Sequence, residues 1–254
     1  MKQTRRIQLL GSELDVLTMQ ETLHEIERLI LRREPTQHVV INASKINLMA
    51  ENPLLRHIVS QSPLINADGQ SVVWAGRFLG HDIPERVAGI DLFQKLVEKA
   101  AEKGWKPYYF GATDEVVRDV VKKHQQMYPQ LQVAGFRNGY FESEESIQIA
   151  EEIRASEADI LFVAFSSPKK EIWIHDHQSI MQVPFAMGVG GSFDVLAGKT
   201  KRAPRWMQRT GLEWFYRFVQ EPRRMFKRYI IGNFIFVKHV WREKRKMKRS
   251  LEDA

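Results

Sequence analysis

The stretch GVGGSFDVLAGKTKRAPRWMQRTGLEWFYRFVQEPRR, residues 188–224, joins two unlike parts of the chain. Before it, apolar runs alternate with helical patterns, and after it comes a basic tail rich in aromatic residues. Residues 199–254 hold 17 Lys and Arg against 5 Asp and Glu, whereas the whole 254-residue chain has a net charge of only +7. This asymmetry predicts that the tail meets an anionic partner. Gly188, Gly190 and Gly191 predict a strand end and a tight turn where a ligand approaches the backbone.

Upstream of this stretch, short apolar strands alternate with amphipathic helices about every 25 residues. This alternation predicts an α/β fold with a mostly parallel sheet and helices on both faces. Gly198 is the candidate boundary between a core, residues 1–198, and a helical appendage, residues 199–254. Strands are expected at 38–44, 64–65, 106–110, 131–136, 159–165 and 183–189, and helices at 20–33, 45–60, 70–79, 91–103, 114–127, 143–155 and 168–178.

The composition excludes several kinds of protein. The chain has no cysteine, which rules out disulfides, thiolate zinc sites and a cysteine nucleophile. Its first residues are basic but have too short an apolar run for a signal peptide. No run of about 18 apolar residues occurs, so no membrane-spanning helix is expected.

In parallel sheets, ligands bind at the carboxyl ends of the strands. An acidic side chain is predicted at the end of one of these strands. The sequence Asn-Ala-Asp-Gly at 66–69 places Asp68 in a turn after a strand. Asp68 is a candidate general base that takes a proton from a hydroxyl nucleophile. The alternative is a helix cap or an Asx turn without catalytic function.

Arg86 lies in a loop that leads into a helix, within Pro-Glu-Arg-Val-Ala-Gly at 84–89. Its guanidinium is suited to clamping a phosphate with two parallel hydrogen bonds. The alternative is a surface arginine paired with Glu85 or Asp91.

Other strand ends carry groups suited to a nucleotide or a sugar. Asn42 and Ser44 end the first predicted strand. Gly111 follows the predicted strand at 106–110, but the GxGxxG pattern is incomplete there, so Gly111 does not identify a dinucleotide site. Lys170, in Ser-Ser-Pro-Lys-Lys-Glu at 166–171, offers an ammonium group at a helix start, where a diphosphate can bind. A capped, solvated helix start is the alternative.

No metal site is predicted. The chain has no D-x-D triplet, and His175 and His177 are too close in a helix to converge on one ion. A G-x-S-x-G nucleophile elbow is also absent.

The tail interleaves aromatic and basic side chains. This mixture favours a lipid interface, where aromatic rings lie at headgroup depth and cations meet anionic lipids. A nucleic-acid surface and a helical subdomain packed on the core are the two alternatives. The aromatic residues are Trp206, Trp214, Phe215, Tyr216, Phe218, Phe226, Tyr229, Phe234, Phe236 and Trp241.

The motifs, taken in order, resemble those of the WecG/TagA/CpsF glycosyltransferase family. The blocks are NADGQSVVWAGRFLG, PERVAGIDL, YYFGA, GYF, SSPKKE and the quoted stretch at 188–224. The resemblance extends from about residue 6 to residue 232 and implies a Rossmann-like core followed by a C-terminal helical appendage that completes the active site.

The resemblance implies an inverting, metal-independent transfer of a sugar from a UDP-sugar to a polyprenyl-diphosphate-linked saccharide in bacterial cell-surface polysaccharide synthesis. No cofactor is expected. The donor sugar is expected to be N-acetylmannosamine, its uronic acid or glucuronic acid. The implied location is the inner face of the cell membrane, reached from the cytoplasm and held through the tail, with no nucleic-acid partner. The resemblance also allows a homo-oligomer.

Residue roles follow from the resemblance. Asp68 matches the family's proposed catalytic base, and Arg86 matches an arginine that binds a phosphate or the acceptor. Substrate-binding roles are expected for Asn42, Ser44, Gly111, Lys170, Gly190, Gly191, Asp194, Arg202, Arg217 and Arg224. Of these, Asp194 is expected near the nucleotide, and Arg217 and Arg224 are expected to stabilise the departing diphosphate.

Two positions depart from the family pattern. Lys170 stands where the family often has Gln, and Val40 stands where it often has Thr. The ammonium of Lys170 leads to the hypothesis of an acidic donor sugar. The alternative function is a non-catalytic, membrane-associated regulator that binds UDP-sugars.

Overall fold

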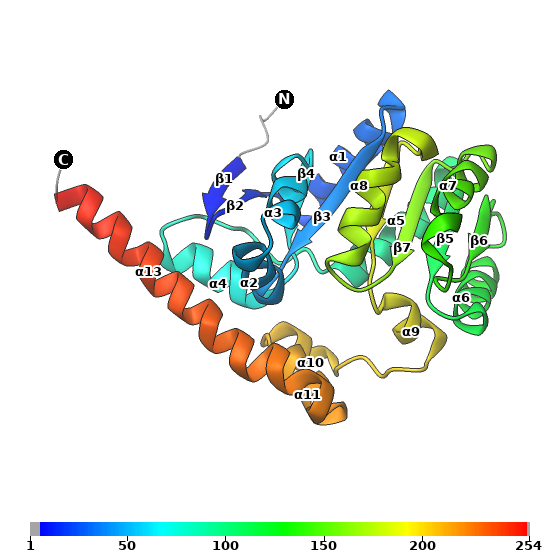
Figure 1. The fold of residues 1–254 in the computed structure, drawn as a ribbon. Coiled ribbons are helices and arrows are strands. Elements are labelled where there is room, and N and C mark those ends of the chain that lie inside the picture. Colours follow the sequence, from blue (N-terminus) through cyan, green and yellow to red (C-terminus); the bar gives the residue numbers. More distant parts are fainter. Residues whose placement is uncertain (1–5, 253–254) are drawn as a thin grey trace.

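The computed structural model describes residues 6–252, excluding the side chains of Arg224 and of residues 250–252. Its centre is a six-stranded sheet in the order β4-β3-β8-β7-β5-β6, and every neighbouring pair is parallel (Figure 1). The predicted α/β fold is therefore confirmed. The strands are β3 Thr36–Ile41, β4 Leu64–Ala67, β5 Pro107–Gly111, β6 Gly135–Arg137, β7 Ile160–Ala164 and β8 Phe185–Gly188.

Helices cover both faces of this sheet. Alternate residues of one strand point to opposite faces, so Phe162 of β7 packs with α1, α5, α6 and α9, whereas Val163 packs with α7 and α8. The helices are α1 Met19–Arg32, α2 Ala43–Glu51, α3 Pro53–Ser60, α4 Gln70–Phe78, α5 Gly89–Lys103, α6 Asp114–Met127, α7 Ser146–Ala155, α8 Lys169–Met181 and α9 Ser192–Ala197.

The single helix predicted over 45–60 is wrong. Proline lacks the N–H that a helix interior needs and disfavours helical geometry in the residue before it, so the chain breaks at Asn52-Pro53. Asn52 then caps the second helix, since its Oδ1 accepts from the N–H of Leu55 at 3.0 Å. The result is two helices, α2 and α3.

Two further elements differ from the sequence prediction. In place of the strand predicted over 131–136, the structure has only the short strand β6, Gly135–Arg137. This strand pairs with β5 alone, at the edge of the sheet. A hairpin that was not predicted, β1 Arg6–Leu9 and β2 Ser12–Asp15, turns through Leu10 and Gly11. Both turn residues have positive φ, at 53° and 75°, as the tight turns of two-residue hairpins require.

The tail folds into helices that return to the core. It comprises α10 Arg205–Arg209, α11 Glu213–Gln220, α12 Pro222–Met225, a π-helix Phe226–Ile231 and α13 Gly232–Glu252. Figure 1 shows α13 running past α2 and α4 toward the β1–β2 hairpin. Phe236 and Val240 of α13 are buried in one hydrophobic cluster with Ile46 and Met49 of α2.

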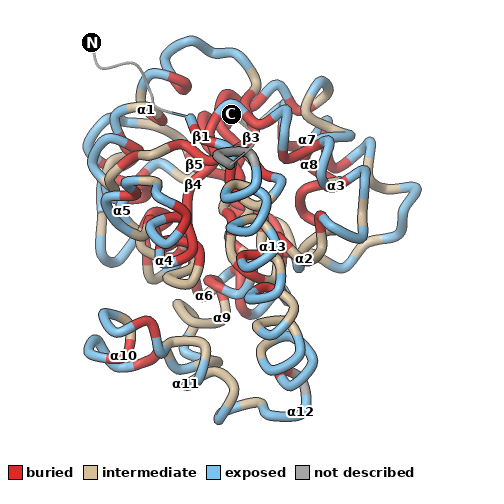
Figure 2. The backbone as a smooth tube through the Cα atoms, turned by 90° about the vertical axis from the view of Figure 1, so that its left-hand side faces the viewer, coloured by how far each residue is buried: buried red, intermediate tan, exposed pale blue. Residues whose placement is uncertain are grey.

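The outer side of these tail helices is largely exposed (Figure 2). Large apolar side chains remain exposed there, among them Phe226, Phe234 and Trp241. In the part of the chain that the structure describes, no helix has the length and apolar character needed to cross a bilayer. The boundary at Gly198 and the docking of the tail on a membrane stay predictions.

Candidate active site

The turn after β4 fixes the carboxylate of Asp68. Oδ1 accepts from the backbone N–H of Gly89, the first residue of α5, at 2.8 Å. Oδ2 accepts from Nδ2 of Asn42 at 3.3 Å. An ionised carboxylate can accept about four hydrogen bonds, so the half-buried side chain is oriented and still has lone pairs for a substrate hydroxyl.

Asn42 joins the ends of β3 and β4. While its Nδ2 donates to Asp68, its Oδ1 caps α2 by accepting from the N–H of Lys45 at 3.0 Å. The two strand ends are packed tightly, because a Cβ on Gly69 would lie 3.1 Å from the Cβ of Asn42. The predicted substrate residue Asn42 thus has a structural task beside Asp68, and Ser44 lies half-buried two residues further along.

Arg86 is tied to the tail. Its Nη1 lies 3.2 Å from Oε2 of Glu213 in α11, and both side chains are largely buried. Glu85 and Asp91, the partners proposed from sequence, are not the ones Arg86 uses. The guanidinium of Arg86 therefore connects the loop before α5 to the appendage.

Arg202 completes this connection. It donates two hydrogen bonds to Asp91, at 2.6 and 2.8 Å, and its Nε lies 3.8 Å from Oε1 of Glu213. Burial opposes the charge of Arg202, but Asp91, Glu213 and Asp68 outweigh burial and raise its pKa. Arg86 and Arg202, from distant segments, are thus gathered around the carboxylate of Glu213.

The glycines at the strand ends meet different demands. Gly111 has φ +125°, and a Cβ there would lie 2.9 Å from the backbone of Ala164, so neighbouring strand β7 excludes a side chain. Gly190 has φ +53°, and a Cβ there would make only an ordinary contact, 3.8 Å from the backbone oxygen of Phe165, so its backbone conformation is what favours glycine. Gly191 is exposed, and Asp194 lies near it in the first turn of α9.

Lys170 lies beneath the carboxyl edge of the sheet rather than in solvent. Its side chain packs over Gly188, where a Cβ would lie 2.5 Å from Cδ of the lysine. Its ammonium donates to Ser167 and lies 2.9 Å from Oε1 of Glu171, which also pairs with the buried Lys45. The ammonium is therefore engaged within the protein.

The charged groups of this buried cluster shift one another's pKa values. Burial and the neighbouring Lys45 lower the pKa of Lys170 to about 8. Burial alone raises the pKa of Glu171, but Lys45 and Lys170 outweigh burial and lower it to about 2. Glu171, which was not predicted from sequence, is the anion that holds the two lysines together.

We expect Glu171→Gln to lower the free energy of unfolding at pH 7 by about 3–5 kcal/mol, because it leaves two buried ammonium groups without their counter-charge. Urea unfolding measures this loss. The folded pKa of Glu171 is below its ordinary value of 4.5, so the stabilisation is present above pH 4.5 and disappears as the pH falls toward 2. The difference between variant and wild type should shrink over that range.

Glu157→Gln is the matched control, since it removes a carboxylate that is 82% exposed and pairs with Lys106. That change should alter stability by less than about 1 kcal/mol. Equal effects of the two variants would show that the buried cluster has no special importance.

The remaining predicted residues belong to the tail. Arg217 lies half-buried in α11, one turn after Glu213, whereas the side chain of Arg224 lies outside the described residues. The turn between α10 and α11 packs on the core near Asp68, because a Cβ on Gly211 would lie 2.8 Å from Cγ of Gln70. The appendage therefore borders the same site as the strand ends.

Residues 6–252 bring no three His, Asp or Glu side chains together in an arrangement that could hold a metal ion. The metal independence of the reaction stays a prediction.

Comparison with known proteins identifies the family. Residues 7–250 match the model of the glycosyl transferase WecG/TagA/CpsF family. The chain belongs to this family. Its reaction class is therefore glycosyl transfer, as the sequence motifs predicted.

Two curated relatives share the name N-acetylglucosaminyldiphosphoundecaprenol N-acetyl-beta-D-mannosaminyltransferase. The protein of Bacillus spizizenii is 34% identical over 174 residues, which is 68% of this chain and 67% of the relative. The protein of Bacillus subtilis strain 168 is 36% identical over 167 residues, which is 66% of this chain and 64% of the relative.

Proposed function

We propose that the protein transfers N-acetylmannosamine from its UDP derivative to N-acetylglucosamine carried on a polyprenyl diphosphate. Family membership and the names of the two relatives support this choice of substrates. The observation that carries the mechanism is the placement of Asp68, oriented by Gly89 and Asn42 at the end of β4.

The chemistry is a single displacement. A free oxygen lone pair of Asp68 takes the proton from the acceptor hydroxyl as that oxygen attacks the anomeric carbon. The bond from the anomeric carbon to the UDP β-phosphate oxygen breaks, and UDP leaves with the electron pair. Attack on the face opposite to UDP inverts the anomeric centre.

The cations of the site match the charge that develops on UDP. Arg86 lies in the loop before α5, whose first residue contacts Asp68, and Arg202 pairs with Asp91 of that helix. Arg217 comes from α11. Fixed cations stabilise a departing diphosphate most when water is excluded. The packing of α10 and α11 over the carboxyl edge supports this role for the tail.

The burial of Lys170 helps to decide between a neutral and an acidic donor sugar. Its ammonium is buried and paired with Glu171, so an extra carboxylate on the sugar would have to compete with an existing ion pair. This favours N-acetylmannosamine over the uronic acids that the sequence also allowed.

The test is UDP release with a short-chain polyprenyl-diphosphate N-acetylglucosamine acceptor. UDP-N-acetylmannosamine should give acceptor-dependent turnover, unchanged by EDTA, and its uronic acid and UDP-glucuronic acid should not. Turnover with a uronic acid alone would overturn the donor assignment. UDP binding without turnover for any donor would favour the non-catalytic regulator.

A further inference from the structure

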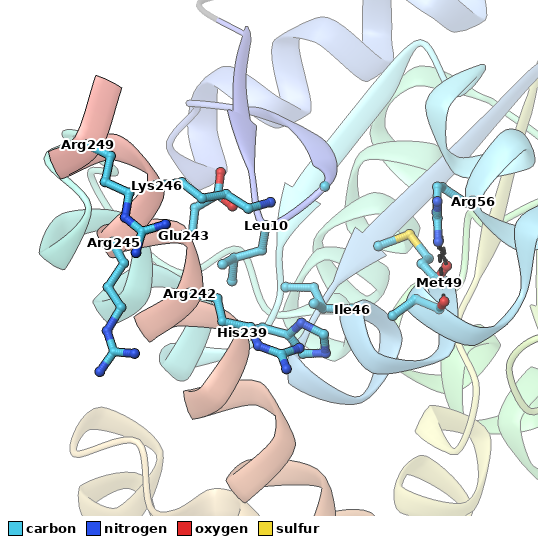
Figure 3. A pocket seen from close by; sticks show the side chains of 12 residues that line it. Leu10, Ile46, Met49, Arg56, His239, Arg242, Glu243, Arg245, Lys246 and Arg249 are labelled. Atoms are coloured by element: carbon cyan, nitrogen blue, oxygen red, sulfur yellow. Dashed lines mark hydrogen bonds between the residues drawn. The ribbon is translucent and has the colours of Figure 1, made fainter. Parts of the chain in front are cut away.

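A groove of about 610 Å³ lies between α13 and the core (Figure 3). One wall is the C-terminal half of α13. The other wall comes from α2, from Arg56 of α3 and from the turn of the β1–β2 hairpin. None of the lining residues belongs to the candidate active site, so the groove is a separate feature of the molecule.

Cations dominate the wall that α13 provides. Arg242, Arg245, Lys246 and Arg249 line it, and among the side chains that the structure describes Glu243 is the only acidic one in the lining. Within the described part of the chain, none of the four cations makes a hydrogen bond or ion pair. Like charges three and four residues apart in a helix repel one another, so a bound anion would relieve this repulsion.

The floor of the groove is apolar. It contains Ile46 and Met49, both buried, together with Leu10 of the hairpin turn. Figure 3 shows Arg242 and His239 projecting over Ile46 and Lys246 extending toward Leu10. Cations above an apolar floor match a ligand that carries a phosphate beside an apolar part, whereas a free inorganic anion would leave the floor unused.

The surroundings point to the same chemistry. Phe234 and Val237, just before the groove-lining part of α13, and Trp241, within it, are 79%, 50% and 56% exposed. Aromatic and apolar side chains next to cations are typical of helices that lie at a lipid interface. The groove volume also falls within the range of about 300–1,000 Å³ that is common for small-molecule sites.

We propose that this groove binds the phosphate group of one anionic phospholipid. The proposal rests on the proposed function, because a lipid-linked acceptor brings the protein to a bilayer. The lipid phosphate contacts the α13 cations, and its glycerol and upper acyl part cover the apolar floor. Since the two walls belong to the tail and the core, a bound lipid fixes α13 against α2, whose N-terminal cap is Asn42.

The decisive comparison is between two neutralising double variants. Arg242→Gln with Arg249→Gln removes two charges from the groove. Lys238→Gln with Lys248→Gln removes two charges from the same helix at positions outside the groove lining. On vesicles of 30% phosphatidylglycerol in phosphatidylcholine, the groove variant should bind at least 10-fold more weakly, and the control less than 3-fold more weakly. Equal losses would contradict a specific binding site in the groove and would indicate a general electrostatic attraction of the helix to the anionic membrane surface.

A soluble probe identifies the ligand. Dihexanoyl-phosphatidylglycerol, titrated below its micelle concentration, should bind saturably to wild type and to the control variant but not to the groove variant. Dihexanoyl-phosphatidylcholine and inorganic phosphate should bind at least 10-fold more weakly. Binding of inorganic phosphate with equal strength would show a free-phosphate site and overturn the lipid assignment.

Measurements of turnover distinguish a failure of the lipid-site proposal from a failure of the proposed function. With a short-chain soluble acceptor and no vesicles, the groove variant should retain wild-type UDP release. Loss of activity there would contradict a separate lipid site, whereas inactivity of wild type itself would count against the proposed function alone. Circular dichroism and thermal unfolding establish that both double variants fold.

Discussion

Asp68→Asn should lower kcat by about 10²–10⁴-fold, the usual contribution of a positioned general base. The amide cannot take up the acceptor proton. It can keep the hydrogen bond from Gly89, but its NH₂ group then faces the NH₂ group of Asn42, so one favourable contact is lost. UDP release measures the rate, and calorimetric titration of UDP should show nearly unchanged binding.

Asp82→Asn is the matched control, because Asp82 is an exposed acid between α4 and the loop of Arg86. It should retain wild-type turnover. Full activity of Asp68→Asn would exclude Asp68 as the base and leave its two hydrogen bonds with a structural purpose only.

Removal of residues from Lys199 onward should lower kcat by at least about 100-fold, since small misplacements of positioning groups have effects of that size. The truncation takes away Glu213 and Arg202, and with them the contacts that hold Arg86 and Asp91. It also uncovers the buried surface under Phe236, which should promote self-association. Gel filtration and UDP release check both effects, and an active, monomeric core would contradict them.

Glu213→Gln in the full chain separates positioning from the loss of the whole tail. It should lower kcat/KM by about 10- to 150-fold, because a hydrogen bond to a charged group contributes about 1.5–3 kcal/mol. When combined with Arg86→Ala, it should add little further loss, because both changes remove the same ion pair. Glu243→Gln, an acid elsewhere in the tail, should leave soluble-acceptor turnover unchanged.

The strand ends could be located from the sequence because parallel strands bring their carboxyl ends to one edge. The buried strands β5, β7 and β8 have continuous apolar runs, which made them recognisable. Asp68 and Asn42, 26 residues apart, meet as this geometry requires. The sequence could not show that Gly89 would supply the second hydrogen bond, since this depends on where α5 begins.

In the tail, local sequence patterns do not determine which side chains are buried or which residues they contact. Phe236 resembles its exposed aromatic neighbours in sequence, yet it is only 4% exposed because α13 packs on α2. Glu213 lies in the stretch that identifies the family, but its contact with Arg86 spans 127 residues. Such pairings depend on tertiary packing, which neither helical periodicity nor charge counts encode.

The hydrophobic cluster that contains Phe236 and Val240 also contains Ile7 and Leu9 of the first hairpin. During synthesis from the N-terminus, at about 5–20 residues per second, the hairpin and α2 emerge long before α13. Their apolar surface therefore stays open until α13 has also been synthesised. The nascent protein has an interval in which a chaperone can bind that surface, and completion of α13 ends the interval.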